Sequence, residues 1–533
     1  MTSTTFGRPA ASTLRNAFRL ALAFAAGKLA FQFALTLWTQ HLGYGYFRDE
    51  FYYIACGRHL AWGYVDHGPI VALQARIGEL IFGDSVFSIR IFSAVAGAVA
   101  VFLTGIVAWA FGGRRPAQAL AMLGVIVCPQ YIAIDGYLSM NSFEPVFWTI
   151  CILALVLIVQ GRSQRLWWLV FGASAGVGLL NKPSMAFFLA AIGIGLLLTG
   201  QRRVLNSRWT LAGVVLMMLI ALPNVLWQVH NHWPTLEFLR NGQMGHKNIV
   251  LSPIQFFLAQ FSNMQPVNAL LWIPGVVALL RAKSIRDGRW LGITFLVFFV
   301  MMLALHAKDY YLAGIYPAYF AAGGIAWESR FVRSRRVQRN RIVAFPIFEG
   351  ILLVTSLIIL PMSSPVLPPA AWVRYTTALR LHGNKLENLA TGPLPQFYAD
   401  RFGWQQEVSI VLNTYRSLSP QDQRRVCIFG NNYGEAGAID FLAPLQDHHT
   451  HLPPAISGQN NYWLWGTHGC DPDVAIAVIS DSPEEIARKY RSVEIVGHLD
   501  NPWAMPYEHK NIYLLRGRRS SAPFHWADER FYF

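Results

Sequence analysis

The sequence predicts a polytopic α-helical membrane protein with a small α/β domain outside the membrane, and three observations support this class. The 533 residues are 54% hydrophobic and only 14% charged, whereas soluble domains carry roughly 25% charged residues. Long apolar runs recur from near the amino terminus to about residue 360, and a tail of more ordinary composition follows. The mean hydropathy is +0.33. Together these values exclude a disordered chain, a collagen-like fibre and a disulfide-rich secreted scaffold.

About eleven apolar runs approach the roughly 20 residues that a helix needs to cross a bilayer. They cover residues 17–38, 87–111, 117–134, 144–160, 166–180, 185–199, 209–229, 266–280, 290–306, 311–327 and 342–360. The first run is too long for a cleavable signal peptide, and Lys28 and Gln32 make its centre too polar. Because a charge is costly in lipid, Lys28 either faces an interior cavity or reaches toward the membrane surface.

The basic residues predict the orientation of the chain. The loops after the even-numbered runs are rich in Arg and Lys, whereas those after the third, fifth and ninth runs are nearly free of them. Cytoplasmic loops carry the excess of Lys and Arg, so we expect a cytoplasmic amino terminus and an extracytoplasmic tail. The net charge of +15 then reflects orientation in the membrane rather than binding to nucleic acid.

The tail predicts a separate domain. A proline-rich linker divides the chain into a membrane domain of residues 1–361 and an outer domain of residues 362–533. Residues 426–429, 474–479, 493–496 and 512–515 are typical of strands, residues 436–442 of a helix, and a further helix opens at 481–485 with acids in its first turn. This order predicts a small α/β domain. Cys427 and Cys470 both lie in it, and a disulfide and two separate thiols remain equally compatible with the sequence.

Polar residues suited to chemistry gather in the loops predicted to lie outside. They are Asp49 and Glu50 in the first loop, Asp135, Asn141 and Glu144 in the second, Lys182 in the third, and Lys308, Tyr310 and Tyr311 in the fifth. One such loop has an ordinary explanation as a solvated surface, but four on one membrane face indicate a functional site. These groups suit a reaction in which a sugar is transferred from a lipid phosphate to an acceptor hydroxyl. The acceptor hydroxyl needs a carboxylate to take its proton, and the departing phosphate needs cationic or tyrosine donors.

At these residues the chain resembles the bacterial membrane glycosyltransferases of family 39, the protein mannosyltransferase and aminoarabinose transferase type with the GT-C fold. The resemblance covers the predicted membrane half. It depends on Asp49-Glu50, the stretch 139–148, Leu180-Asn181-Lys182-Pro183, the stretch 308–317, and the segment 222–235. Parts of the tail, including residues 399–404, 432–436 and 457–463, are similar to the outer domain of some bacterial members.

The resemblance implies that Asp49 is the general base and that a polyprenyl-phosphate sugar is the donor, with inversion at the anomeric carbon. Glu50 would bind the acceptor or orient its loop, and Lys308 with Tyr310 or Tyr311 would meet the donor phosphate. Glu144 stands where many members have an Asp before Pro, which leaves its role open. The acceptor would be a glycan, lipid or protein outside the bacterial inner membrane, in which the multi-pass chain would reside.

No cofactor is expected, and no Cys and His spacing resembles a zinc site. A divalent metal is compatible with the acids around the site, but the family mostly works without one. The main alternative is a transporter or flippase of a lipid-linked saccharide, which predicts charged groups at mid-membrane and broken helices in related halves. A second alternative is a non-catalytic scaffold, which leaves the four polar loops unexplained. Sugar transfer by the purified protein separates the three.

Overall fold

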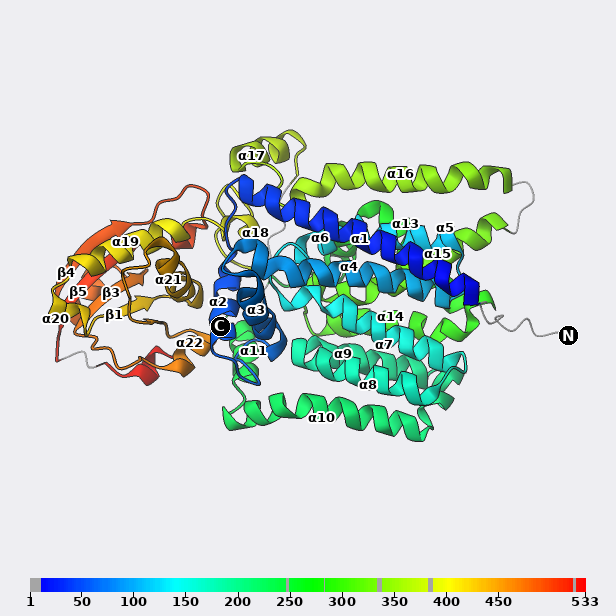
Figure 1. Ribbon diagram of the computed structural model, residues 1–533, viewed down its shortest axis with the longest axis horizontal. Helices are drawn as coiled ribbons and strands as arrows, with labels where there is room; N and C mark the ends of the chain where they lie inside the picture. Colours follow the sequence, from blue (N-terminus) through cyan, green and yellow to red (C-terminus); the bar gives the residue numbers. More distant parts are fainter. Residues whose placement is uncertain (1–10, 246–248, 282, 333–337, 382–386, 521–523) are drawn as a thin grey trace. The chain divides into compact units, whose positions relative to one another are not determined.

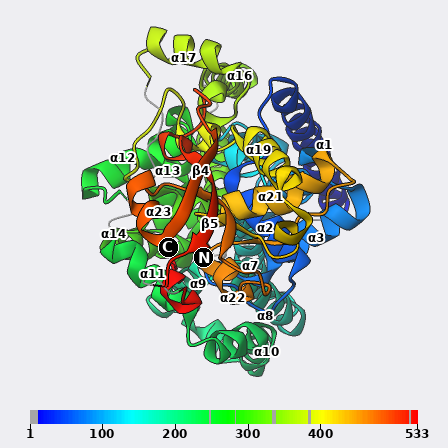
Figure 2. The same ribbon diagram turned by 90° about the vertical axis from the view of Figure 1, so that its left-hand side faces the viewer.

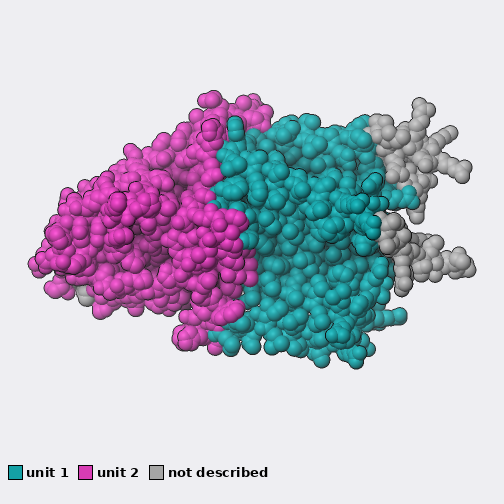
Figure 3. Space-filling view, viewed as in Figure 1, with its two compact units in different colours: residues 1–38, 87–226, 250–366 teal, residues 39–86, 227–249, 367–533 magenta. Residues whose placement is uncertain are grey.

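A computed structural model describes residues 11–245, 249–281, 283–332, 338–381, 387–520 and 524–533. The chain forms two compact units, each assembled from three chain segments (Figure 3). Unit 1 contains residues 1–38, 87–226 and 250–366, and unit 2 contains residues 39–86, 227–249 and 367–533. The boundary at residues 366–367 is close to the predicted division at residue 361. Unit 2 differs from the predicted outer domain because two earlier segments pack with the tail.

Unit 1 is built from helices among its described residues (Figure 1). In chain order they are α1 (Ala11–His41), α4 (Val86–Ala110), α5 (Arg115–Ile126), α6 (Pro129–Ile134), η1 (Met140–Ser142), α7 (Glu144–Val159), α8 (Gln164–Asn181), α9 (Ser184–Leu197), η2 (Gly200–Leu205), α10 (Arg208–His230), α12 (Pro253–Asn263), η3 (Pro266–Asn268), α13 (Ala269–Arg281), η4 (Lys283–Gly288), α14 (Arg289–Ala304), η5 (Asp309–Ile315), α15 (Tyr316–Val332) and α16 (Gln338–Ser363). The last residues of α1 and α10 belong to unit 2. Each predicted apolar run overlaps at least one of these helices.

Within the described residues, five helical segments are long and apolar enough to cross a membrane, or six if a bent pair is counted as one span. The polytopic helical class is therefore confirmed, while the count of eleven spans stays a prediction. One predicted run is broken, and another meets a helix outside the predicted runs at a sharp angle. The run 117–134 is divided between α5 and α6, because Pro129 has no backbone N–H to continue the first helix. Helix α12 and the segment 266–281 meet at an angle of 102°.

A buried ion pair joins α1 to the end of α6 inside unit 1. The Lys28 ammonium lies 2.8 Å from the Asp135 carboxylate, and both side chains are almost completely buried. The same ammonium donates to Gln32, one helical turn further along α1. Since an unpaired charge in an apolar interior is costly, the pair explains how a lysine is accommodated in the middle of a predicted span. Lys28 therefore faces the interior of unit 1.

Unit 2 combines short helices with one mixed sheet. Its helices are α2 (Arg48–Arg58), α3 (Pro69–Phe82), α11 (Pro234–Met244), α17 (Pro369–Ala378), α18 (Gln396–Ala399), α19 (Trp404–Ser417), α20 (Pro420–Gln423), α21 (Tyr433–Gln446), α22 (Asn460–Trp465), α23 (Pro483–Lys489), η6 (Pro506–Glu508) and η7 (Trp526–Glu529). Helix α2 packs closely on α21. A Cβ atom on Gly437 would lie 3.0 Å from the backbone of Phe51, so glycine permits this approach.

The sheet has five strands in the order β2-β1-β3-β5-β4, with β2 (Ala455–Ile456), β1 (Cys427–Gly430), β3 (Val474–Ile479), β5 (Asn511–Arg518) and β4 (Tyr490–His498). Strands β2, β1 and β3 are parallel, whereas β5 is antiparallel to both β3 and β4. Figure 2 shows β4 and β5 side by side. Helices α19 and α21 pack against the sheet. On the opposite face, Ala475, Ala477 and Leu515 form a small core with Ile486 of α23.

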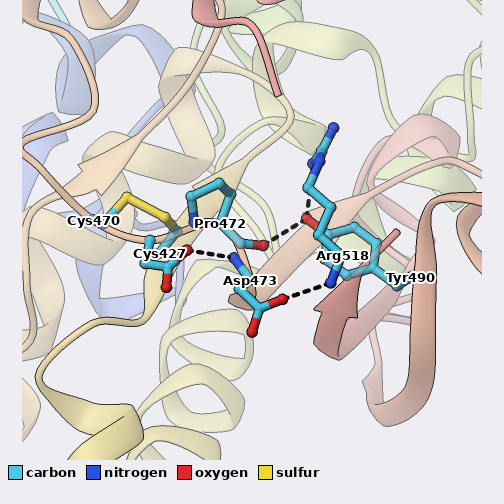
Figure 4. Close-up of a disulfide and its surroundings, with 7 residues drawn as sticks. Cys427, Cys470, Pro472, Asp473, Tyr490 and Arg518 are labelled. Carbon is cyan, nitrogen blue, oxygen red and sulfur yellow. Dashed lines mark hydrogen bonds between the residues drawn. A yellow bond between two sulfur atoms is a disulfide. The ribbon is translucent and has the colours of Figure 1, made fainter. Parts of the chain in front are cut away.

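The predicted strands of the tail all form, within a few residues of their expected bounds. Helix α23 begins as predicted, because Ser482 and Glu485 form a reciprocal capping box at its amino end. Helix α19 was not predicted, although Trp404, Val408, Val411 and Leu412 are spaced as the buried face of a helix. Cys427 and Cys470 form a disulfide (Figure 4), which decides between the two alternatives that the sequence left open.

Candidate active site

Asp49 lies in the first turn of α2, where a carboxylate is favoured by the exposed N–H groups of the helix end. Its side chain is 27% exposed, so one side of the carboxylate is accessible. The Tyr433 hydroxyl donates to Asp49 Oδ1 at 2.9 Å, and the Nε of Arg48 approaches the same oxygen at 3.4 Å. These two contacts orient the carboxylate within unit 2.

Glu50 has a different environment from its neighbour. It is fully buried, and its Oε2 accepts a hydrogen bond of 2.8 Å from the backbone N–H of Phe47. This is the side-chain half of a capping contact, so Glu50 fixes the start of α2. A direct role in acceptor binding stays a prediction.

Behind Asp49, a chain of hydrogen bonds holds Arg48 in place. The Arg48 Nη1 donates to the Tyr507 hydroxyl at 2.8 Å, and that hydroxyl donates to Asp400 Oδ1 at 2.5 Å. The guanidinium also lies over the rings of Tyr433 and Tyr507. The arrangement keeps a cation beside Asp49.

A second carboxylate in unit 2, Asp66, is held in a similar way. The Tyr52 hydroxyl lies 2.9 Å from Asp66 Oδ1, and the Tyr52 ring stacks on the Tyr433 ring with centroids 4.5 Å apart. Burial raises the pKa of Asp66, and the negative charge of Asp49 raises it further. Next to it, burial lowers the pKa of His67. Asp49 and Asp66 are thus two acids with different surroundings, each bonded to one of two stacked tyrosines.

Of Asp49 and the residues bonded around it, the sequence predicted only Asp49. Tyr433 and Asp400 lie in segments of the tail that are similar to the family, but the sequence indicates no role for either of them or for Asp66. Their recruitment depends on contacts between residues hundreds of positions apart, as in the Asp49–Tyr433 bond. We call Arg48, Asp49, Asp66, Asp400, Tyr52, Tyr433 and Tyr507 the Asp49 cluster.

The pKa of Asp400 predicts how stability changes with pH. Burial raises this pKa from 3.8 to about 7, against the opposing effect of Arg48. The folded protein therefore holds the proton more tightly than the unfolded chain, and its stability should fall as the pH rises from about 4 to about 7. Asp400→Asn should remove the contribution of this carboxylate to the loss of stability. At pH 8 it should raise the free energy of unfolding by about 1–4 kcal/mol.

Thermal unfolding of wild type and Asp400→Asn between pH 4 and pH 8 measures this effect. The two proteins should unfold at similar temperatures near pH 4 and diverge as the pH rises toward 7. Curves that remain parallel across the range would show that Asp400 does not titrate there.

Unit 1 contains the other predicted cluster, centred on Lys182 in the turn between α8 and α9. The Lys182 ammonium donates to Asn141 Oδ1 at 2.8 Å and to Glu144 Oε2 at 3.1 Å. It lies 4.2 Å from the ring centroid of Tyr311 and 5.7 Å from that of Tyr310. We call these five residues the Lys182 cluster. They come from three of the four predicted loops.

Glu144 is anchored from two sides in this cluster. It is buried in the first turn of α7, and the Ser184 hydroxyl donates to its Oε1. Because one carboxylate neutralises one ammonium, the cluster has no net charge. Only two of the three donors of the Lys182 ammonium are used by Asn141 and Glu144, so an anion that approaches can still accept a hydrogen bond.

The structure places the other predicted residues of unit 1 differently. Lys308 is half-buried at the amino end of η5, two residues before Tyr310. Asp135 is in the buried pair with Lys28, where it holds the segment that leads to Asn141. Its predicted role toward an acceptor stays a prediction. Among the described residues, no group of three or more His, Cys, Asp or Glu side chains is arranged to hold a metal ion.

Comparisons with known proteins agree with this fold. Residues 66–227 match the family model described as dolichyl-phosphate-mannose-protein mannosyltransferase. The chain is similar over 94% of its length to two crystal structures of ArnT from Cupriavidus metallidurans, with TM-scores of 0.59 for the form bound to undecaprenyl phosphate and 0.56 for the apo form. These matches cover 99% and 100% of the ArnT chains at 16% identity, so they establish the fold. The predicted resemblance to the GT-C membrane glycosyltransferases of family 39 is confirmed.

In sequence, the chain is similar to undecaprenyl phosphate-alpha-4-amino-4-deoxy-L-arabinose arabinosyl transferases of Pseudomonas fluorescens. It is 27% identical to transferase 1 of strain Pf0-1 and 30% identical to transferase 2 of strain Pf-5, each over 168 residues. The aligned regions cover 31% and 30% of this chain, and 29% and 28% of the relatives. The sequence match thus spans less than a third of the length of these relatives.

Proposed function

We propose that the protein is an inverting glycosyltransferase that moves a sugar from a polyprenyl-phosphate donor to a hydroxyl group of an extracytoplasmic acceptor. The observation that carries this proposal is the partly exposed Asp49 carboxylate, oriented by Tyr433 and Arg48, in a chain with the fold of a protein crystallised with undecaprenyl phosphate. A carboxylate with one open side and fixed orientation is suited to accept the proton of an attacking hydroxyl.

In the proposed reaction the acceptor oxygen attacks the anomeric carbon while its proton moves to Asp49. The bond between the anomeric carbon and the phosphate oxygen breaks, and the polyprenyl phosphate leaves with the electron pair. The developing phosphate charge needs cationic donors, and in unit 1 Lys182 and Lys308 are suited to supply them. The rings of Tyr310 and Tyr311 lie against the Lys182 ammonium, and their hydroxyl groups are further hydrogen-bond donors for the phosphate.

Transfer by the purified protein in liposomes tests the proposal. Two radiolabelled donors are supplied, undecaprenyl-phosphate aminoarabinose and polyprenyl-phosphate mannose, because the similar proteins are named for these sugars. A washed bacterial envelope fraction provides the acceptors. Label should move from lipid to acceptor. Movement of intact donor between the leaflets without transfer would favour the flippase alternative and contradict the proposal.

A substitution of Lys308 tests directly whether this residue binds the donor phosphate. Its ammonium is at the start of η5, two residues before Tyr310. Loss of one charge-assisted hydrogen bond to a phosphate costs roughly 1.5–3 kcal/mol, so Lys308→Ala should slow transfer by at least about tenfold. Single-turnover transfer at saturating donor measures this. Unchanged turnover would make Lys308 an ordinary membrane-surface anchor.

The proposed orientation places the amino terminus and Arg-rich loops in the cytoplasm and unit 2 outside. Asn206, between Arg203 and Arg208, is exposed, and so is Ser480 after β3. In intact cells an impermeant thiol reagent should label Ser480→Cys and leave Asn206→Cys unlabelled until the membrane is permeabilised. The native free thiols Cys56, Cys128 and Cys151 are buried, so background labelling should be low. The reverse pattern would overturn the orientation.

A further inference from the structure

A cavity of about 390 Å³ lies within unit 2, on the face of the sheet that α23 covers. This volume is in the range of small-molecule sites, roughly 300–1,000 Å³. The floor consists of strand residues that include Phe429, Ala475 and Ala477. The two small alanines leave room above the sheet at a place where larger side chains would fill it. No step of the proposed reaction uses this cavity.

The cavity has the position that ligand sites favour in open α/β sheets. Its lining includes Asn431 directly after β1, Gly458 after β2 and Asp481 after β3, which are the carboxyl ends of the three parallel strands. Strand β1 has β2 on one side and β3 on the other, so the order of the chain reverses there. Ligands bind outside the carboxyl ends of strands at such a switch point.

The lining points to a neutral ligand with polar edges and an apolar face. Lys489 forms an ion pair with Asp481 at 3.4 Å, and Arg518 donates to the Tyr490 hydroxyl at 3.1 Å (Figure 4). With Glu529, the lining carries two cations and two carboxylates. This balance does not favour an anion such as a nucleotide. It suits hydroxyl groups, which both donate and accept hydrogen bonds.

One aromatic side chain of the lining is both exposed and rigidly held. Phe531 is 48% exposed, yet its backbone N–H donates to the Gly458 carbonyl at 2.8 Å and its own carbonyl accepts from the Asn460 N–H at 3.0 Å. An exposed ring on a fixed backbone gives a flat apolar surface at little cost in conformational entropy. Such a surface fits the apolar face of a pyranose ring.

The cavity is also connected to the Asp49 cluster inside unit 2. Tyr433, which donates to Asp49, lies two residues after Asn431. Its backbone N–H donates to Gln459 at 3.0 Å, and Gln459 follows Gly458 in the chain. Thus the same two loops that form the rim of the cavity hold the hydroxyl that orients the Asp49 carboxylate.

We propose that this cavity is an acceptor subsite that binds a saccharide unit, with the sugar ring against Phe531 and its hydroxyls toward Asn431, Asp481 and Lys489. The inference rests on the proposed function, because only a glycosyl acceptor gives the saccharide its part in the reaction. It names the acceptor class as a molecule that already carries sugar.

Saturation-transfer NMR on the full-length protein tests the subsite. The protein is held in lipid nanodiscs, so that no glycoside detergent competes, and the probes are the methyl glycosides of glucose, galactose, mannose, arabinose and N-acetylglucosamine. At least one probe should receive saturation from the protein. Ala477→Phe, which fills the cavity, should weaken its binding by about tenfold or more, or 1.4 kcal/mol. Phe531→Ala removes a half-exposed ring that stacks on Phe533 and should weaken glycoside binding at least about threefold. The matched control Ala487→Phe, on the exposed side of α23, should bind like wild type.

Saturation of none of the five probes would overturn the inference, as would binding that Ala477→Phe and Phe531→Ala leave unchanged. Phe531→Ala keeps the test decisive if Ala477→Phe does not fold. The readout needs no donor and no turnover, so it is independent of the proposed function. If the protein binds glycosides but transfers no sugar, the proposed reaction is contradicted. If it transfers sugar but binds no glycoside, only the proposed subsite is contradicted.

Discussion

Asp49→Asn is expected to reduce single-turnover sugar transfer by about 10²-fold or more, the usual contribution of a positioned base. An amide of nearly the same shape cannot take the acceptor proton. The Tyr433 hydroxyl can still donate to the Asn oxygen at the position where it now bonds Asp49 Oδ1, so folding should survive. Donor binding should also be retained, because the substitution removes a negative charge and the donor is an anion.

Glu50→Gln provides the matched control for this variant. It makes the same change of charge one residue along the same helix, and glutamine can still accept the hydrogen bond of the Phe47 N–H. We expect a much smaller effect on the chemical step. Wild-type transfer by Asp49→Asn, or equal losses in both variants, would remove Asp49 as the base and make Asp66, the other acid of the Asp49 cluster, the next candidate.

The second large effect is expected at Lys182. A single Lys182→Met substitution would leave Glu144 buried without its cation, which costs about 3–5 kcal/mol of stability. The double variant Lys182→Met/Glu144→Gln keeps the site neutral and removes the ammonium. If the ammonium binds the donor phosphate, transfer should fall by about 10- to 150-fold, equivalent to the roughly 1.5–3 kcal/mol of a charge-assisted hydrogen bond.

Glu144→Gln alone is the control for the double variant. It retains Lys182, which still donates to Asn141 and lies against Tyr311, so transfer should stay close to wild type. Thermal unfolding of each variant separates lost stability from lost activity. A folded double variant with the turnover and donor KM of wild type would assign the Lys182–Glu144 pair to the support of unit 1 alone.

Much of the architecture was predictable because it depends on local properties of the chain. An apolar run of sufficient length forms a helix in a membrane whatever its neighbours are, since no water satisfies its backbone. The acids of the first turn predicted the start of α23 for a similar reason, because the residues that fix a helix start, here Ser482 and Glu485, lie within one turn. Breaks inside a run were harder to predict. Pro129 ends the continuity of the run 117–134, but the same residue type occurs inside α10 and α13 without ending them.

The candidate residues show the same division. Asp49, Lys182 and Glu144 were identified from their residue types and their places in the predicted outer loops. Their partners were not, because Tyr433 is 384 positions from Asp49 and no local pattern connects them. Glu50 and Asp135 show the converse, as the sequence marked both as site residues and the structure gives one a capping contact and the other a buried partner in Lys28.

By itself, the sequence determined that this protein is a polytopic helical membrane protein with an α/β tail, and it identified the acids and lysines that merit a catalytic test. Only the tertiary structure decided which of these groups are neutralised, which are oriented and which remain open to a ligand. It also revealed the cavity beside β1, whose lining comes from strands and loops spread over more than one hundred residues of the tail. The physical reason is that apolarity and capping act within a few residues, whereas burial and the pairing of charges depend on distant segments that meet only in the folded chain.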